Sequence, residues 1–116
     1  MPKRVAEDEI IVVCPELMLA FLKYAHSKPE IYKEVFDALP IAGVDGTLKY
    51  RMKGGKAYGN VRAKTGTVSG VSTLAGYLKA DNGHEIAFVI MNQQVLDGKA
   101  ARSFQDKLCE VLCSLK

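Results

Sequence analysis

Residues 61–77 read VRAKTGTVSGVSTLAGY, and this stretch decides the fold. Its β-branched and small residues predict two successive strands, over 61–68 and 71–79. The tripeptide Asp81-Asn82-Gly83 then predicts a tight hairpin into a third strand over 85–91. Residues 86–91 are all apolar, so we expect helices to cover both faces of the third strand.

Helical patterns flank these strands. Pro15 suits a helix start, and the apolar spacing continues to about His26; a second short helix is predicted from Glu30 to about Ala38, where Pro40 stops it. Near residue 97 a third helix is predicted to begin, with Asp97 as a cap. Its expected buried stripe is Ala101, Phe104, Leu108, Val111, Leu112 and Leu115. This order predicts an α+β fold, an antiparallel sheet flanked by helices.

Two other stretches have simpler interpretations. The run Ile10 to Val13 suits a strand or an extended lead-in. The apolar stripes of the first two helices, Leu17, Met18, Phe21, Leu22 and Ala25 and then Ile31, Val35, Phe36 and Leu39, are expected to face the core.

The centre of the stretch, Lys64-Thr65-Gly66-Thr67, has the chemistry of an anion and peptide site. Lys64 offers an ammonium with three donors, and Thr65 and Thr67 add hydroxyls that can hydrogen-bond a carboxylate. Gly66 has no Cβ, so another backbone can come close. On an exposed sheet edge such a strand could pair with an extended peptide, and the Thr67 N–H could stabilise an oxyanion.

A wider pattern surrounds these four residues. It reads Pro40-x-Ala42-Gly43-x-Asp45-Gly46-Thr47-Leu48, then Gly59-x-Val61-x-Ala63-Lys64-Thr65-Gly66-Thr67-x-x-Gly70-Val71-Ser72-x-Leu74-Ala75-Gly76-Tyr77. This closely resembles the C-terminal part of penicillin-binding-type D-alanyl-D-alanine carboxypeptidases. The nearest subgroup is that of the low-molecular-mass carboxypeptidase/endopeptidases, relatives of the serine β-lactamases. The resemblance runs from about Val13 to Leu112.

The resemblance implies a partial β-lactamase/transpeptidase-like fold. Residues 1–116 would be the C-terminal part of a catalytic domain that acts on a peptidoglycan stem peptide or a β-lactam. Lys64 and Thr67 are the implied catalytic residues: Lys64 would stabilise the terminal carboxylate and tune the protons of the site, and Thr67 would give its N–H to the oxyanion hole. Thr65 would bind the same carboxylate, and Gly66 would admit the substrate strand.

Two further motifs of that family, Ser-x-x-Lys and Ser-x-Asn, do not occur in the 116 residues. The Tyr58-Gly59-Asn60 tripeptide is interpreted as a turn. We therefore expect the nucleophile to lie on other sequence and this chain alone to be inactive, as a fragment of an exported parent of the periplasm or cell envelope. The start of the chain, Met1 to Arg4 followed by Glu7 to Glu9, does not have a signal-peptide pattern.

Composition and charge bear on whether the chain binds an anionic ligand, nucleic acid, a membrane or a cofactor. From Lys49 to Lys64 the chain has six basic residues and no acidic one, which fits either attraction of an anionic cell-wall ligand or an ordinary solvated loop. A pI near 8.8 is too modest to favour nucleic acid. The longest apolar run is too short for a membrane span, and neither a metal nor another cofactor is expected; the cysteines Cys14, Cys109 and Cys113 are interpreted as buried thiols.

Two alternatives to the enzyme fragment stay open. One is a non-catalytic module that binds cell-wall peptides, and the other is an inert folding fragment. If the third strand lacks a neighbour, the exposed sheet edge also predicts a homo-oligomer.

Overall fold

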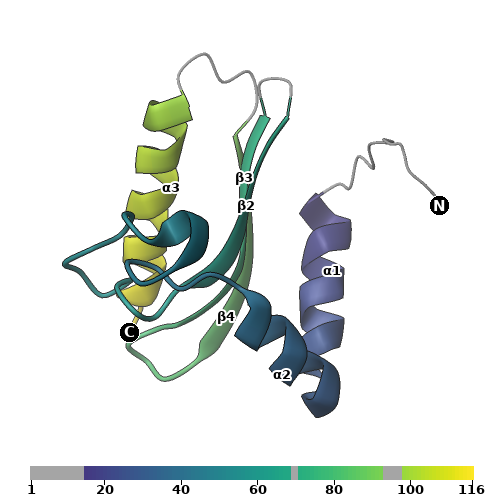
Figure 1. Cartoon of the computed structure of the whole chain (residues 1–116). Helices are drawn as coiled ribbons and strands as arrows, with labels where there is room; N and C mark the ends of the chain where they lie inside the picture. The colour runs from purple at the N-terminus through teal and green to yellow at the C-terminus, as the bar shows by residue number, and fades with distance from the viewer. Residues whose placement is uncertain (1–14, 69–70, 93–97) are drawn as a thin grey trace.

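A three-stranded antiparallel sheet with helices on both faces forms the fold (Figure 1). The computed structural model describes residues 15–68, 71–92 and 98–116. Within these ranges lie α1 (Pro15–His26), α2 (Pro29–Ala38), the short 3-10 helix η1 (Gly46–Leu48), β2 (Arg62–Val68), β3 (Val71–Lys79), β4 (Glu85–Asn92) and α3 (Gly98–Cys113). The predicted α+β class is confirmed, and each predicted strand agrees with its observed bounds to within one residue.

The strands lie in the order β2-β3-β4, as expected for consecutive antiparallel neighbours. Thr65 lies opposite Leu74 in β3, and Gly76 lies opposite Phe88 in β4. The turn between β3 and β4 contains Gly83 with φ +88°, a conformation that favours glycine. The Asn82 side chain accepts a hydrogen bond from the His84 N–H at 2.9 Å, which fixes this turn.

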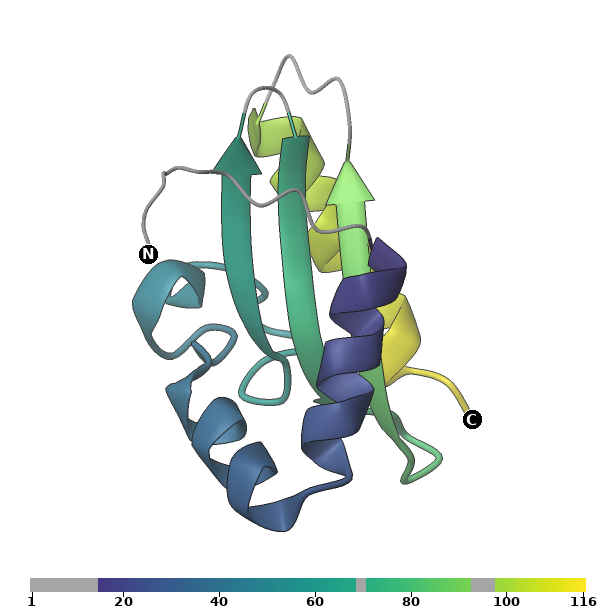
Figure 2. The same cartoon turned by 90° about the vertical axis from the view of Figure 1, so that its right-hand side faces the viewer.

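The sheet is buried on both faces, as predicted for residues 86–91. On one face Leu74, Phe88 and Ile90 form a core with Cys109 of α3. On the other face Ala75 and Tyr77 form a second core with Leu22 of α1 and the apolar side of α2. Figure 2, turned by 90°, shows α1 in front of the sheet and α3 behind it.

The predicted buried stripe of α3 is wrong in half of its members. Phe104, Val111 and Leu115 are exposed, whereas Gln105, Cys109 and Cys113 are buried together with Ala101. The helix therefore places the i, i+4 row that begins at Ala101 against the sheet, and its larger apolar side chains lie to one side. Leu108 and Leu112 pack against the edge of this core.

The α1 stripe is also only partly buried. Leu22 and Ala25 lie in the core and Met18 packs against it, but Leu17 and Phe21 are 60% and 54% exposed. Three other sequence interpretations lie outside the described residues. They are the strand or lead-in over residues 10–13, the buried thiol of Cys14 and the cap at Asp97. The remaining cysteines, Cys109 and Cys113, are free and buried as expected.

Candidate functional site

The edge of β2 that faces away from β3 is the main feature of the candidate site, and among the described residues only the loop at residues 40–42 pairs with its backbone. Ala63 donates its N–H to the Pro40 carbonyl at 3.0 Å, and the Val61 carbonyl accepts from the Ala42 N–H at 2.9 Å. These bonds lie on the side of β2 away from β3. Because backbone groups alternate along an antiparallel pair, the N–H groups of Thr65 and Thr67 point to this same side. The loop at residues 40–42 thus covers the beginning of the edge, and the Thr65 and Thr67 N–H groups follow it.

Lys64 and Thr65 lie next to each other in β2 but present their side chains to opposite faces of the sheet. Thr65 shares the α3 face with Ala63, which is fully buried there. Lys64 shares the α1 face with Arg62, whose guanidinium lies 4.1 Å from the centroid of the Phe36 ring in α2. The sequence alone contained this signal, since strand side chains alternate with a period of two.

The polar ends of the two side chains have different partners. The exposed Lys64 ammonium donates to the Thr65 carbonyl at 2.6 Å, and the Thr65 hydroxyl donates to the Thr47 hydroxyl of η1 at 3.1 Å. Thr67 is described only as backbone, in β2 opposite Ser72. The four predicted site residues therefore lie along one strand edge, with the Lys64 ammonium above it and the Thr65 hydroxyl below it.

At Gly66 the strand has little room for a side chain. A Cβ at Gly66 would lie 2.8 Å from the Thr73 hydroxyl of β3, and that hydroxyl donates to the Gly66 carbonyl at 3.4 Å. The missing side chain leaves room for the Thr73 hydroxyl on the α1 face of the sheet. An incoming backbone could approach here without a steric block.

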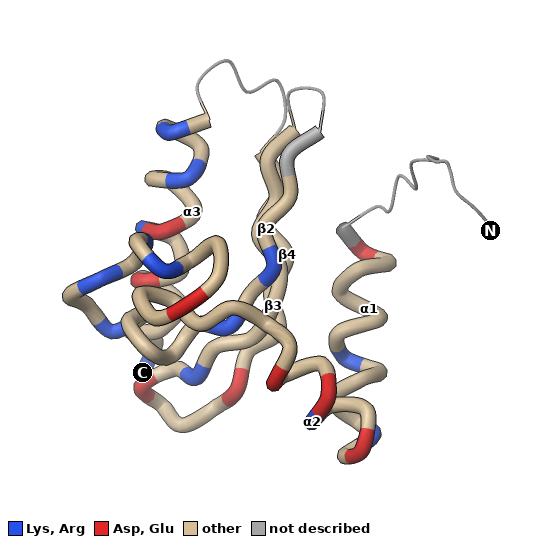
Figure 3. Tube along the Cα trace, viewed as in Figure 1, with Lys and Arg blue, Asp and Glu red and all other residues tan. Residues whose placement is uncertain are grey.

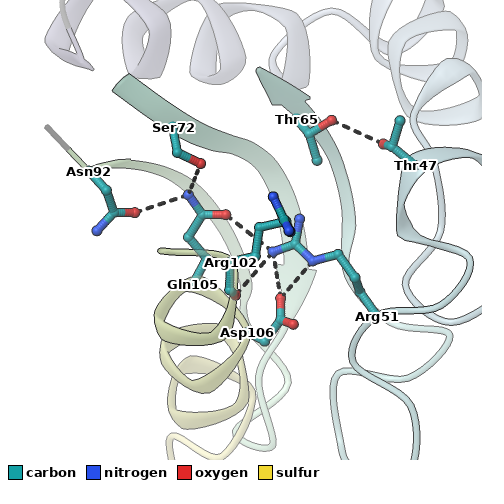
Figure 4. Close-up of polar contacts among 8 residues, drawn as sticks. All are labelled: Thr47, Arg51, Thr65, Ser72, Asn92, Arg102, Gln105 and Asp106. Carbon is teal, nitrogen blue, oxygen red and sulfur yellow. Dashed lines mark hydrogen bonds and ion pairs between the residues drawn. The ribbon is translucent and has the colours of Figure 1, made fainter. Parts of the chain in front are cut away.

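A hollow of about 170 Å³ lies beside Thr65 on the α3 side. Its walls are mostly hydroxyl and guanidinium groups, from Thr47, Arg51, Thr65, Ser72, Thr73 and Arg102. Figure 4 shows how the side chains of η1, β2, β3 and α3 converge there. The sequence analysis did not single out Arg102 or Gln105, because neither belongs to a motif and only the packing of α3 brings them to β2.

Arg51 and Gln105 form the floor of this region. The Arg51 guanidinium donates to Asp106 Oδ1 at 2.6 and 3.0 Å, to Gln105 Oε1 at 3.1 Å and to the Arg102 carbonyl at 3.2 Å. Gln105 is fully buried, and its amide donates to Ser72 at 3.2 Å and to Asn92 at 3.0 Å. Every polar atom of the Gln105 side chain is thus bonded, which fixes α3 against the sheet.

The basic stretch from Lys49 to Lys64, called the basic connector below, is partly neutralised by acidic residues of other elements. Arg51 pairs with Asp106, Lys56 pairs with Asp81, and Arg62 lies 3.9 Å from Asp37. Glu110 of α3 accepts the backbone N–H groups of Lys56 and Ala57. In Figure 3 the blue segments of this connector lie beside red segments of α3. Lys49, Lys53 and Lys64 lie on its exposed side. Attraction of an anionic ligand by these lysines stays a prediction.

Residues 15–68, 71–92 and 98–116 also bear on two other kinds of site, metal centres and membrane spans. No group of three or more His, Cys, Asp or Glu side chains in these ranges is arranged to hold a metal ion. None of the helices there is long and apolar enough to cross a membrane. Tyr58-Gly59-Asn60 forms a turn as expected, and the Asn60 amide pairs with both backbone groups of Lys79.

Solved structures show the class of protein to which this fold corresponds. The chain superposes on penicillin binding protein 4 of Haemophilus influenzae with a TM-score of 0.77 and 30% sequence identity, covering 89% of this chain and 25% of that one. A second structure of that protein is a complex with a β-lactam. The architecture is thus that of one part of a penicillin-binding protein.

Curated relatives indicate the same class of protein. A D-alanyl-D-alanine carboxypeptidase of Actinomadura sp. (strain R39) is 47% identical over 76 residues, which are 61% of this chain and 14% of the relative. D-alanyl-D-alanine carboxypeptidase DacB of Haemophilus influenzae is 37% identical over 100 residues, 83% of this chain and 19% of that protein. The chain belongs to the D-Ala-D-Ala carboxypeptidase 3 (S13) family, whose sequence pattern it matches over residues 10–115. It spans less than a fifth of the length of either relative.

Proposed function

We propose that this chain supplies one wall of the substrate site of a serine-type D-alanyl-D-alanine carboxypeptidase/endopeptidase that acts on peptidoglycan stem peptides. The observation that carries the proposal is the free β2 edge, where the N–H groups of Thr65 and Thr67 point away from β3 beside Lys64 and Gly66. Residues 1–116 would form the C-terminal part of the catalytic domain. The parent protein would work in the periplasm or cell envelope.

The edge geometry suggests how the substrate would dock. An extended peptide that approaches β2 would accept the Thr65 N–H, as a further antiparallel strand does. The Thr67 N–H, two residues further on the same side, would then point at the carbonyl oxygen under attack and stabilise the developing negative charge. Lys64 would give up its hydrogen bond to the Thr65 carbonyl in favour of the substrate or of a proton transfer within the site.

The attacking serine would come from other sequence, since the 116 residues contain neither Ser-x-x-Lys nor Ser-x-Asn. Under this proposal the chain binds and orients the peptide, and it cannot form the acyl-enzyme by itself. Binding and oxyanion groups without a nucleophile retain only a small part of such catalysis. The 116-residue chain is therefore expected to remain unlabelled by penicillin.

A chimera tests the proposal. Residues 10–115 would replace the matching segment of the Haemophilus influenzae carboxypeptidase, and the intact mass would be measured after incubation with penicillin. We expect a covalent adduct on the chimera and none on the 116-residue chain. Lys64→Gln in the chimera should slow acylation about a hundredfold, the scale of a lost proton-transfer group. Lys107→Gln, an exposed lysine of α3, is the matched control.

The alternatives predict other outcomes. An adduct on the isolated 116-residue chain would contradict the assignment of the nucleophile to other sequence. A chimera that folds by circular dichroism, binds stem peptide and stays unlabelled would favour the non-catalytic binding module. A folded chimera that neither labels nor binds peptide would favour an inert fragment.

A further inference from the structure

The positively charged side chains that share a face of the sheet with the Thr65 hydroxyl differ from those on the face of Lys64. A carboxylate bound by the Thr65 hydroxyl would lie on the α3 side of the sheet, whereas the Lys64 side chain leaves the strand on the α1 side. The guanidinium groups that line the hollow beside Thr65 are those of Arg51 and Arg102. A second positive charge is therefore built into the α3 side, where no family motif places one.

These two arginines are not equivalent. Arg51 is held by Asp106, whose charge neutralises it, and by the carbonyl groups of Gln105 and Arg102; its side chain is only 12% exposed. Arg102 is exposed, and no carboxylate among the described residues forms an ion pair with its guanidinium. Arg51 thus serves the packing of α3, whereas Arg102, labelled in Figure 4, is an exposed residue that lines the hollow.

The surroundings of the hollow suit an anion. Thr47, Thr65 and Ser72 contribute hydroxyl groups to its walls, and Arg102 contributes a planar set of donors that matches a carboxylate. Because Asp106 neutralises only one of the two guanidinium groups, Arg51, Arg102 and Asp106 together keep a net positive charge beside the hollow. The buried Gln105 anchors α3 beside Ser72, and residue 102 lies one helical turn before it on the same helix, so that both residues line the hollow together with Thr65.

We propose that Arg102 binds the C-terminal carboxylate of the peptide substrate, together with the Thr65 hydroxyl, and so selects peptides that end in a free carboxylate. This inference rests on the proposed function, because it takes the β2 edge as the docking strand. It assigns the counter-charge of the carboxylate to a residue of α3. Lys64 is then left for the groups on the other face of the strand.

Titration of the full 116-residue chain tests the assignment without any need for turnover. The ¹⁵N-labelled chain would be titrated with N-acetyl-D-alanyl-D-alanine and with its C-terminal amide. We expect saturable shifts of the Thr65 and Ser72 amide signals with the acid, and at least tenfold weaker binding of the amide. Arg102→Gln should weaken binding of the acid about tenfold, the scale of one lost charge-assisted hydrogen bond, and leave binding of the amide unchanged.

Matched variants separate charge from stability. Lys107→Gln removes one exposed positive charge from the same helix and should bind the acid like the wild type, and Arg102→Lys should lie between the wild type and Arg102→Gln. Equal affinity of Arg102→Gln and the wild type for the acid, equal affinity of the wild type for acid and amide, or no saturable shift would each overturn the inference. A chimera that is acylated by penicillin while Arg102→Gln leaves the titration unchanged would preserve the proposed function and remove only the role of Arg102.

Discussion

Among the described glycines, Gly76 in the middle of β3 has the least room for an added Cβ. A Cβ built there would lie 2.0 Å from the Arg62 carbonyl oxygen and 2.6 Å from the Ala63 Cα, both backbone atoms of β2. Backbone atoms cannot rotate away, so Gly76→Ala must push β2 from β3. We expect a loss of about 3 kcal/mol in the free energy of unfolding, measured by urea denaturation.

Gly66→Ala is the matched control for this prediction, because it makes the same change in the neighbouring strand. Its Cβ would meet only the Thr73 hydroxyl, at 2.8 Å, which a side-chain rotation can move. The cost should stay below about 1 kcal/mol. Equal losses in the two variants would contradict the view that the backbone of β2 is what excludes a side chain at residue 76.

At the residue scale the strand that carries the candidate site could be predicted from the sequence, whereas the residues packed around it could not. The strand alternation that puts Lys64 and Thr65 on opposite faces follows from a period of two and could be predicted from the sequence. Arg102 could not, because its place depends on how α3 lies across the sheet. A single polar residue in a helix has no local signal for the strand that it will meet.

For the element β2, hydrogen exchange gives a direct test of the free edge. The N–H groups of Arg62, Lys64 and Gly66 point toward β3, and that of Ala63 is held by Pro40, so all four should be protected. Thr65 should exchange much faster than its neighbours, since its N–H points to the open side. Amide exchange followed by NMR measures each residue, and slow exchange at Thr65 in the free chain would contradict an open edge.

For the element α3, the testable contact is the ion pair between Asp106 of this helix and Arg51 of the basic connector. Asp106→Asn leaves the largely buried Arg51 guanidinium without its counter-charge, so we expect a loss of about 2 kcal/mol in the free energy of unfolding. Lys33→Gln breaks the exposed Lys33–Asp37 pair of α2 and should cost less than about 0.5 kcal/mol. Similar denaturation midpoints for the two variants would show that Arg51 finds other partners.

The helix α3 also shows why a hydrophobic stripe can mislead. Phe104, Val111 and Leu115 have the spacing of a buried face, yet the row that packs on the sheet contains Gln105 and the two cysteines. Gln105 can be buried because Ser72, Asn92 and Arg51 satisfy its amide, and these partners come from distant segments. The strands were easier to predict, since short apolar runs and the Asn82-Gly83 turn define them locally.

At the scale of the whole molecule, apolar surface remains uncovered. On α1 the side chains of Leu17, Phe21 and Tyr24 are each more than half exposed, and on α3 so are Phe104 and Val111. Surfaces of this kind are typical of contacts with further protein. Association of copies through the outer edge of β4, which has only β3 as a neighbouring strand among the described residues, stays a prediction. The expected result is a sedimentation coefficient that rises with concentration in sedimentation velocity, and a monomer at every concentration would contradict it.

The stability of the whole chain should fall at alkaline pH. Burial raises the pKa of the Cys109 thiol to about 12 and that of Cys113 to about 11, from an ordinary value of 9.0. Burial also raises the pKa of Tyr77, and burial followed by the hydrogen bond to Glu85 raises that of Tyr32. The neutral forms are therefore favoured in the folded chain. Between pH 9 and pH 11 the unfolded chain releases protons that the folded chain retains, so each rise in pH favours unfolding.

The expected curve of unfolding free energy against pH is flat just below pH 8 and falls above pH 9, by up to about 1.4 kcal/mol per pH unit for each thiol. Urea denaturation at a series of pH values measures it. Between pH 9 and pH 10 Cys113→Ala should reduce the fall more than Tyr32→Phe does, because the thiol of the unfolded chain ionises at lower pH than the phenol. At pH 8 the neutral, buried thiols of the native chain should also resist iodoacetamide and react once urea unfolds it, which peptide mapping resolves for each cysteine. Rapid native alkylation of Cys109 or Cys113, or a stability that rises from pH 9 to pH 10, would show that the core of α3 opens to water.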